Sequence, residues 1–202
     1  MNNKTVVYVH GKGGSADEAA QYRTLFPSAN VYGIDYVKST PWEVGKEIHD
    51  SIVSLCLNSD KPILIANSIG AYFSMYAGIE EYVEKAFFIS PIVDMEKLIG
   101  KMMAQARVTD EELKRRGSIR TDSGEELSWD YYSFVKDHPV TWNVPTEVLY
   151  GSEDTLTDPE TVSSFCVEHR AKLTVMDGGE HWFHTEEQLY FLYKWIKEGT
   201  NK

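Results

Sequence analysis

A serine that could act as a nucleophile stands in the segment Ala66-Asn67-Ser68-Ile69-Gly70, between an apolar run and a helical pattern. A sharp strand-to-helix turn lifts such a serine hydroxyl above the edge of a sheet. The turn brings the flanking positions together, so Ala66 and Gly70 must be small, although glycine is usual at the first of them. The alternative is an ordinary serine in a strand–helix loop, and these residues alone do not decide between the two.

A carboxylate and an imidazole follow two later strand-like runs, as the nucleophile follows an earlier one. Asp154 ends the segment 150–154, and His181 follows two glycines in the segment 178–183. A hydroxyl, an imidazole and a carboxylate in a hydrogen-bonded row supply nucleophile, general base and orienting acid. We therefore expect Ser68, His181 and Asp154 to converge over one edge of the sheet.

Each of these partners has a rival nearby. Asp158 precedes a proline and suits the N-cap of the next helix better than catalysis, while Glu153 is expected to be a solvated loop charge. His184 lies where the last helix starts, so a capping or surface role is expected for it. His181 and His184 as a metal pair would need a third ligand that the spacing does not suggest. The remaining histidines, expected to be structural or exposed, are His10, His49, His138 and His169.

A glycine-rich loop at 10–14 comes directly after the first apolar run. Backbone N–H groups in such a loop can face the oxyanion that develops when a carbonyl is attacked. The expected donors are the N–H groups of Lys12, in this loop, and of Ile69, next to the serine. The alternative is a glycine-rich turn without a chemical role.

The same loop also allows an interpretation from another class, dinucleotide binding. Residues 11–16 fit G-x-G-x-x-A after a strand, and Asp35 ends the next strand at a fitting distance. This short match leaves Ser68, Asp154 and His181 unexplained, and a nicotinamide-binding titration would separate the two interpretations.

The chain alternates strand-like and helix-like segments, which predicts an α/β fold with a mostly parallel sheet covered by helices on both faces. The alternation stops at about 91–145, where Asp94, Thr109 and Ser128 could each begin a helix, so a helical insertion is expected. Strands are expected at 5–10, 30–34, 62–66, 85–90, 146–150 and 172–176. Helices are expected at 15–26, 42–57, 69–79, 159–169 and 186–197.

Composition limits the remaining classes. The 202 residues are 42% hydrophobic and 25% charged, with a net charge of −11, as in one ordinary globular domain. No basic stripe is present, which disfavours nucleic-acid binding. The N-terminal residues lack the form of a signal peptide, no apolar run reaches membrane-spanning length, and two cysteines in helical apolar patterns favour free thiols. We expect a cytoplasmic protein that binds neither membrane nor nucleic acid.

The order Ser68, Asp154, His181, each after a strand, together with the glycine loop, resembles the α/β-hydrolase fold superfamily over essentially the whole chain. The resemblance implies a small member, 1–202 as a single domain with a helical cap at about 91–145 and about six strands, lacking the first two antiparallel strands of larger relatives. It gives Ser68, Asp154 and His181 the triad positions and Lys12 and Ile69 the oxyanion positions.

The function expected from this resemblance is a serine hydrolase that cleaves a carboxylic ester through an acyl-enzyme, with a small-molecule substrate and no metal or organic cofactor. Thioesterase or peptidase activity, and a non-catalytic binding module of the same fold, are the alternatives. Substrate contacts are expected from Gly11, Met102, Trp129 and Trp182, although Met102 and Trp129 could simply pack the cap. The oligomeric state does not follow from the sequence.

Overall fold

The computed structural model describes residues 4–57 and 60–200 and divides the chain into two compact units. The first unit comprises Met1–Val93 and Thr141–Lys202, and the second comprises Asp94–Val140. The second unit falls within the segment 91–145, where the alternation of strands and helices was expected to stop. All residues discussed below as a candidate site, apart from Met102 and Trp129, belong to the first unit.

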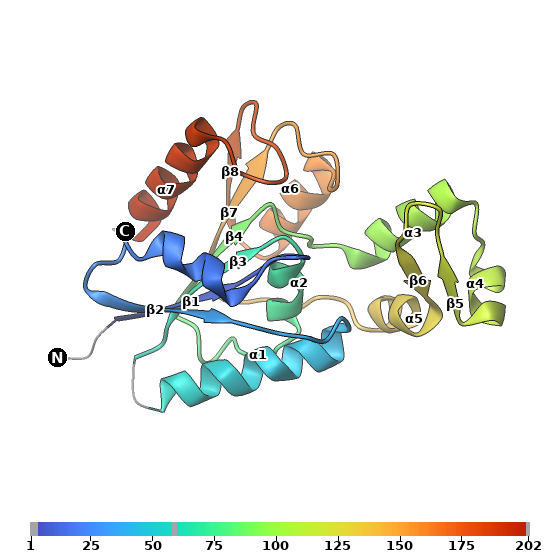
Figure 1. Ribbon diagram of the computed structural model, residues 1–202, viewed down its shortest axis with the longest axis horizontal. Coiled ribbons are helices and arrows are strands. Elements are labelled where there is room, and N and C mark those ends of the chain that lie inside the picture. The colour runs from blue at the N-terminus through green and yellow to red at the C-terminus, as the bar shows by residue number, and fades with distance from the viewer. Residues whose placement is uncertain (1–3, 58–59, 201–202) are drawn as a thin grey trace. The chain divides into compact units, whose positions relative to one another are not determined.

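A six-stranded sheet forms the centre of the first unit (Figure 1). Its strand order is β2-β1-β3-β4-β7-β8, and every neighbouring pair is parallel. The expected parallel sheet is therefore confirmed. The strands are β1 (Lys4–Val9), β2 (Ala29–Ile34), β3 (Ile63–Asn67), β4 (Lys85–Ile89), β7 (Thr146–Gly151) and β8 (Lys172–Met176).

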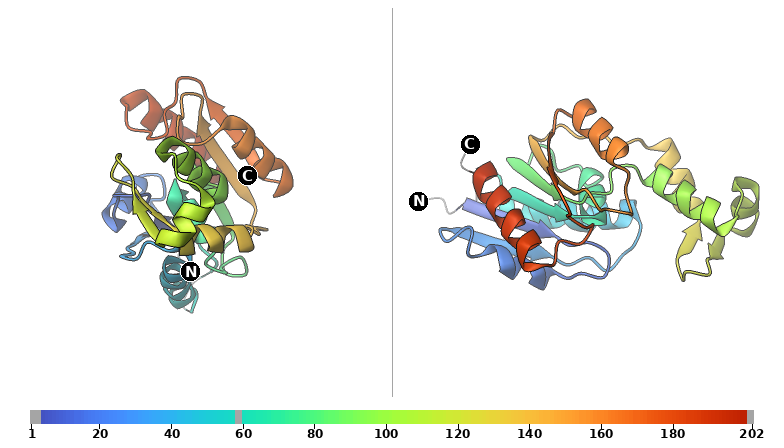
Figure 2. Two further views of the ribbon diagram at one scale, coloured as in Figure 1. Left: turned by 90° about the vertical axis from the view of Figure 1, so that its right-hand side faces the viewer. Right: turned by 90° about the horizontal axis from the view of Figure 1, so that it is seen from above.

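Helices cover both faces of this sheet, as expected for parallel strands (Figure 2). A 3₁₀-helix, η1, and α7 lie on one face, and α1, α2 and α6 lie on the other. Among the described residues, no helix has the length and apolar content that crossing a bilayer requires. The bounds are η1 (Ala16–Tyr22), α1 (Pro41–Cys56), α2 (Ile69–Met75), α6 (Pro159–Glu168) and α7 (Glu186–Thr200).

The core follows from the alternation of side chains along buried strands. On the face covered by η1 and α7, Tyr8, Ile65 and Phe87 pack with Tyr22 and Trp195 in one apolar cluster. Their neighbours in the strands point to the other face and are also almost fully buried. Burial on both faces explains why these strands appear in the sequence as nearly continuous apolar runs.

Two expected helices differ from the prediction. In the segment 15–26, where a helix was expected, only Ala16–Tyr22 is helical, and it forms a 3₁₀-helix. The first turn of this helix is held by the Asp35 carboxylate, which accepts a hydrogen bond from the Ala16 N–H (2.8 Å). The helix after Ser68 ends at Met75 rather than near residue 79, because Gly78 adopts a φ of 62° that an α-helix does not allow.

The second unit is not wholly helical, which corrects the expectation for this segment. Thr109, Ser128 and Asp94 cap its three helices as predicted, each accepting a backbone N–H. Between the second and third helices, however, an antiparallel hairpin forms around a turn in which Gly124 has a φ of 88°. The elements are α3 (Met95–Ala106), α4 (Asp110–Arg116), β5 (Ser118–Arg120), β6 (Glu126–Ser128) and α5 (Trp129–Asp137).

Candidate active site

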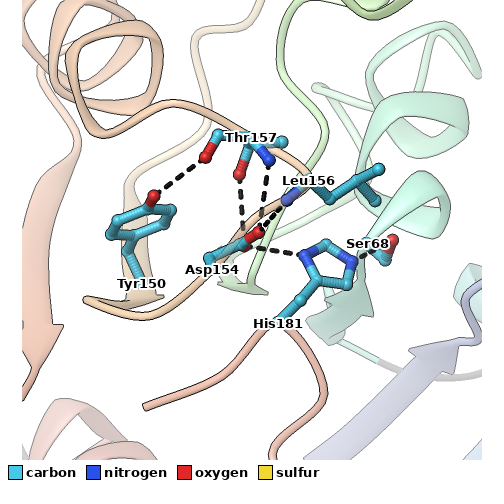
Figure 3. A network of polar contacts seen from close by, with 6 residues as sticks. All are labelled: Ser68, Tyr150, Asp154, Leu156, Thr157 and His181. Carbon is cyan, nitrogen blue, oxygen red and sulfur yellow. Dashed lines mark hydrogen bonds and ion pairs between the residues drawn. The ribbon is translucent and has the colours of Figure 1, made fainter. Parts of the chain in front are cut away.

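Three side chains from separate loops meet at the carboxyl edge of the sheet (Figure 3). Ser68 directly follows β3, Asp154 follows β7 and His181 follows β8. The Ser68 Oγ lies 2.9 Å from His181 Nε2, and His181 Nδ1 lies 2.7 Å from Asp154 Oδ2. The structure thus brings together the three residues that sequence reasoning singled out, in a row of two hydrogen bonds.

The Ser68 backbone forms a strained turn between β3 and α2, with a φ of 53° and a ψ of −120°. Such a conformation is uncommon for a residue with a Cβ and persists only where neighbouring structure holds it. A Cβ built on Gly70 would lie 2.4 Å from the His10 carbonyl oxygen, so only glycine permits this approach of α2 to β1. Ala66 is fully buried on the strand side of the turn. Glycine at 70 is therefore required for steric reasons, and the small residue at 66 lies in a fully buried position.

Asp154 is held by its own loop. Its buried carboxylate accepts hydrogen bonds from the Leu156 N–H (2.8 Å) and the Thr157 N–H and hydroxyl (3.2 Å each), while Tyr150 donates to the Thr157 carbonyl (Figure 3). Burial alone would raise the pKa of Asp154, but the hydrogen bond and charge of His181, with the backbone amides, lower it below its usual value. The site therefore favours an ionised carboxylate facing His181.

The loops that carry the acid and the base pack directly on each other. A Cβ on Gly151 would lie 2.3 Å from the Gly179 carbonyl oxygen, and that carbonyl accepts a hydrogen bond from the Glu153 N–H (2.8 Å). The close approach requires glycine at 151 and fixes the loop of Asp154 against the loop of His181. The Glu153 side chain itself is exposed, as expected for a loop charge.

The glycine loop after β1 is oriented by His10. This residue is buried and stacks on Tyr36 at 4.1 Å between ring centroids, and its Nδ1 donates to the Gly11 carbonyl (2.8 Å). In a trans peptide the N–H points opposite to the C=O, so the Lys12 N–H faces away from His10. The N–H of Ile69 begins α2, where the first N–H groups have no acceptor within the helix. The role of these two N–H groups as oxyanion donors stays a prediction.

A pocket of about 390 Å³ opens beside Ser68. Gly11 lies against the serine, since a Cβ there would be 3.2 Å from the Ser68 Cβ. Trp182, 71% exposed, also lines the pocket, whereas Met102 and Trp129 belong to the second unit and their role in binding stays a prediction. The lining residues are Gly11, Lys12, Gly13, Gly14, Glu18, Asn67, Ser68, Leu156, His181 and Trp182.

The rival residues occupy other places. His184 is exposed, with its Nδ1 2.7 Å from the Trp182 carbonyl, and Asp158 is the N-cap residue of α6. Within residues 4–57 and 60–200, no three His, Cys, Asp or Glu side chains are grouped so as to hold a metal ion. Cys56 and Cys166 are free thiols, the second of them buried.

The geometry of the glycine loop disfavours dinucleotide binding. A pyrophosphate site of this kind needs the N-terminus of an α-helix, but the loop leads into η1. The Asp35 carboxylate that would bind a ribose accepts the Ala16 N–H instead. A Cβ on Gly14 would lie 2.5 Å from Glu18 Oε1, so a carboxylate already occupies the space against the loop and would repel a phosphate.

Sequence reasoning missed two residues of the pocket, Glu18 and Leu156. Glu18 lies three residues after Ser15, and this Ser-x-x-Glu spacing is a signal of helix capping that carries no hint of a pocket. Leu156 is 38% exposed, next to the loop of Asp154. A large apolar residue two positions after a candidate catalytic acid was the available signal for it.

No protein-family model matches the sequence, and no curated protein matches it either. Solved structures do resemble it. Est1E from Butyrivibrio proteoclasticus superposes with a TM-score of 0.75 at 16% identity, covering 98% of this chain and 87% of that one. Mouse alpha/beta hydrolase domain-containing protein 10 superposes with a TM-score of 0.74 at 15% identity, and the match covers 100% of this chain and 92% of that one. A thermophilic esterase from Thermogutta terrifontis superposes with a TM-score of 0.65 at 14% identity, and the match covers 99% of this chain and 90% of that one.

The chain therefore has the α/β-hydrolase fold, as its motifs predicted. At these identities the likeness concerns the fold, and the assignment of chemistry depends on the site itself.

Proposed function

We propose that this protein is a serine hydrolase that cleaves a small carboxylic ester, with Ser68 as nucleophile, His181 as general base and Asp154 as the orienting acid. The observation that carries the proposal is the unbroken row of hydrogen bonds from the Ser68 hydroxyl through the imidazole to a buried carboxylate. A serine on a strained strand-to-helix turn, joined to such a row, is the arrangement that acyl transfer requires.

The first half of the reaction forms an acyl-enzyme. Because Asp154 accepts the Nδ1–H of His181, the lone pair of Nε2 faces Ser68 and takes its proton as Oγ attacks the ester carbonyl. The C–O bond to the alcohol then breaks, and the imidazolium returns the proton to the leaving oxygen. Asp154 stabilises the imidazolium while it exists.

The second half releases the acid. A water molecule gives a proton to His181 Nε2 and attacks the acyl carbonyl, the bond to Ser68 Oγ breaks, and the serine recovers its proton. In both halves the negative charge on the carbonyl oxygen would be stabilised by the N–H groups of Ile69 and Lys12. Removing one such donor typically costs about 10²–10³-fold in kcat.

Two further observations support an ester as substrate. Several solved structures of the same fold carry the word esterase in their names, among them that from Thermogutta terrifontis. The pocket combines a polar wall along the glycine loop with the exposed apolar side chains of Leu156 and Trp182. Such a pocket suits an uncharged carbonyl group with an apolar substituent. Thioesters and amides would react through the same three residues, so a series of matched esters, thioesters and anilides is needed to distinguish the three substrate classes.

Labelling with a fluorophosphonate tests the proposal, because the reagent reacts with activated serines. We expect the wild-type protein to be labelled on the peptide that contains Ser68, and the variant Ser68→Ala to remain unlabelled. Ser54→Ala, at an exposed serine on α1, is the matched control and should be labelled like the wild type.

Hydrolysis of p-nitrophenyl esters of increasing chain length, with matched thioesters and anilides, then identifies the substrate class. Ser68→Ala should lower kcat by about 10⁴- to 10⁶-fold. An unlabelled wild-type protein that hydrolyses none of these compounds would refute the proposal and favour a non-catalytic binding module.

A further inference from the structure

Glu18 places a carboxylate in the pocket beside Ser68, on the side formed by the glycine loop. It is the third residue of η1 and is half-buried. The reaction proposed above does not use it, since the triad already contains its acid. Because it lines the pocket of the candidate active site, its carboxylate can contact a bound substrate.

The orientation of this carboxylate is fixed from two sides. The Tyr8 hydroxyl donates to Oε2 (2.5 Å), and the Ser15 N–H donates to Oε1 (3.3 Å). The pKa of Tyr8 is raised, mainly by burial and further by the neighbouring Tyr22 and Glu18. The Tyr8 hydroxyl therefore stays protonated and can donate its hydrogen bond to Glu18. Asn67, next to the nucleophile, also hydrogen-bonds Tyr8. A chain of polar contacts therefore links Glu18 to the residue beside Ser68.

The glycine loop makes room for the carboxylate. A Cβ on Gly14 would lie 2.5 Å from Glu18 Oε1, so the absence of a side chain at 14 allows the carboxylate to stand directly against the loop. An ionised carboxylate offers about four acceptor sites, and the two donors described above use half of them. Because Glu18 lines the pocket, a ligand bound there can also contact this carboxylate.

We propose that Glu18 determines substrate specificity by binding a cationic group on the ester whose carbonyl reacts at Ser68. This inference rests on the proposed function and names its substrate class. The formal charge of −11 also raises the local concentration of cations around the protein. Lys12, which lines the same pocket, carries the opposing charge. If Lys12 governs selection instead, neutral or anionic esters will be preferred and the proposal is wrong.

A pair of esters matched in shape tests the charge alone: butyrylcholine and its uncharged carbon analogue, 3,3-dimethylbutyl butyrate. We expect the wild-type kcat/KM to favour the choline ester about tenfold, mainly through KM, as for a charge-assisted contact in a partly exposed site. Glu18→Gln keeps the capping geometry, which accepts either residue, and should bring the ratio of the two kcat/KM values close to one by weakening binding of the choline ester.

Asp17→Asn is the matched control, because Asp17 is an exposed carboxylate in the same turn of η1. It should leave the ratio at its wild-type value. A wild-type ratio of one or below, or a choline preference that survives in Glu18→Gln, overturns the role of Glu18 even if both esters are hydrolysed.

Binding to Ser68→Ala, measured calorimetrically with the same two esters, separates this inference from the proposed function. Glu18-dependent selectivity for the choline ester without turnover by the wild type would support the cation site and refute the hydrolase. Turnover of both esters without selectivity would support the hydrolase and refute the cation site. Neither turnover nor selective binding would refute both.

Discussion

Replacing Asp154 by asparagine should reverse the hydrogen bonds of the row rather than simply weaken them. In the wild type, Asp154 Oδ1 accepts the N–H groups of Leu156 (2.8 Å) and Thr157 (3.2 Å), while Oδ2 faces His181 Nδ1. In Asp154→Asn, the same two amides hold the side-chain oxygen in the Oδ1 position. The amide nitrogen is then forced to face His181, where it can only donate.

The imidazole must then accept this hydrogen bond with the lone pair of Nδ1, so the proton of the neutral ring moves to Nε2. The proton then points at the Ser68 hydroxyl, and the imidazole cannot accept its hydrogen. A wrong tautomer of this kind costs about 10⁴-fold in kcat in a serine protease triad. We expect about 10³- to 10⁴-fold here, equivalent to about 4–5.5 kcal/mol in the activation barrier.

The assay is kcat for a p-nitrophenyl ester, with thermal melting to verify the fold and ¹⁵N NMR to identify the protonated nitrogen of His181. Glu153→Gln, at the exposed neighbouring carboxylate, is the matched control and should stay within about twofold of the wild type. The reasoning is refuted if Asp154→Asn is folded and retains more than a tenth of the wild-type kcat, or if Nδ1 remains protonated in it.

Three further changes test the surrounding structure. Gly70→Ala places a Cβ 2.4 Å from the His10 carbonyl oxygen and should lower the free energy of unfolding by about 1–3 kcal/mol in denaturant melts. Burial opposes ionisation of Glu147, but the neighbouring Lys85 (2.8 Å) outweighs burial and lowers the pKa of Glu147. The ionised Glu147 therefore stabilises the fold at neutral pH, and this stabilisation is lost on acidification. Glu147→Gln should thus reduce the loss of folding stability between about pH 5 and pH 3. His184→Ala, at the rival base, should leave kcat within about twofold in the ester assay.

The sheet could be predicted from the sequence because its central strands are buried on both faces and therefore appear as continuous apolar runs. The hairpin of the second unit could not, because strands β5 and β6 have three residues each, too few to show a period. Their charged ends, Arg120 and Glu126, further hide the pattern. The available signal was Gly124 between two isolated apolar residues, which is typical of a turn.

The same contrast holds in the site. Ser68, Asp154 and His181 could be predicted to converge because parallel strands end at one edge of the sheet, whatever the details of their loops. Glu18 could not, because its place in the pocket depends on contact between its carboxylate and Gly14 in the preceding loop. A contact of this kind arises from the tertiary path of the chain and leaves no periodic signal.

The backbone of Ser68 is held by contacts with one short neighbouring segment. The Ser68 N–H donates to the Ile89 carbonyl (2.9 Å), and the Ser68 carbonyl accepts the Ile92 N–H (3.2 Å). The chain can reach both sides of the nucleophile because Ser90, between them, adopts a φ of 43°. The strained backbone at Ser68 and at Ser90 costs about 1–3 kcal/mol each. The strain at Ser68 persists because the buried turn at Ser90 lies between the two residues that hydrogen-bond the N–H and C=O of Ser68.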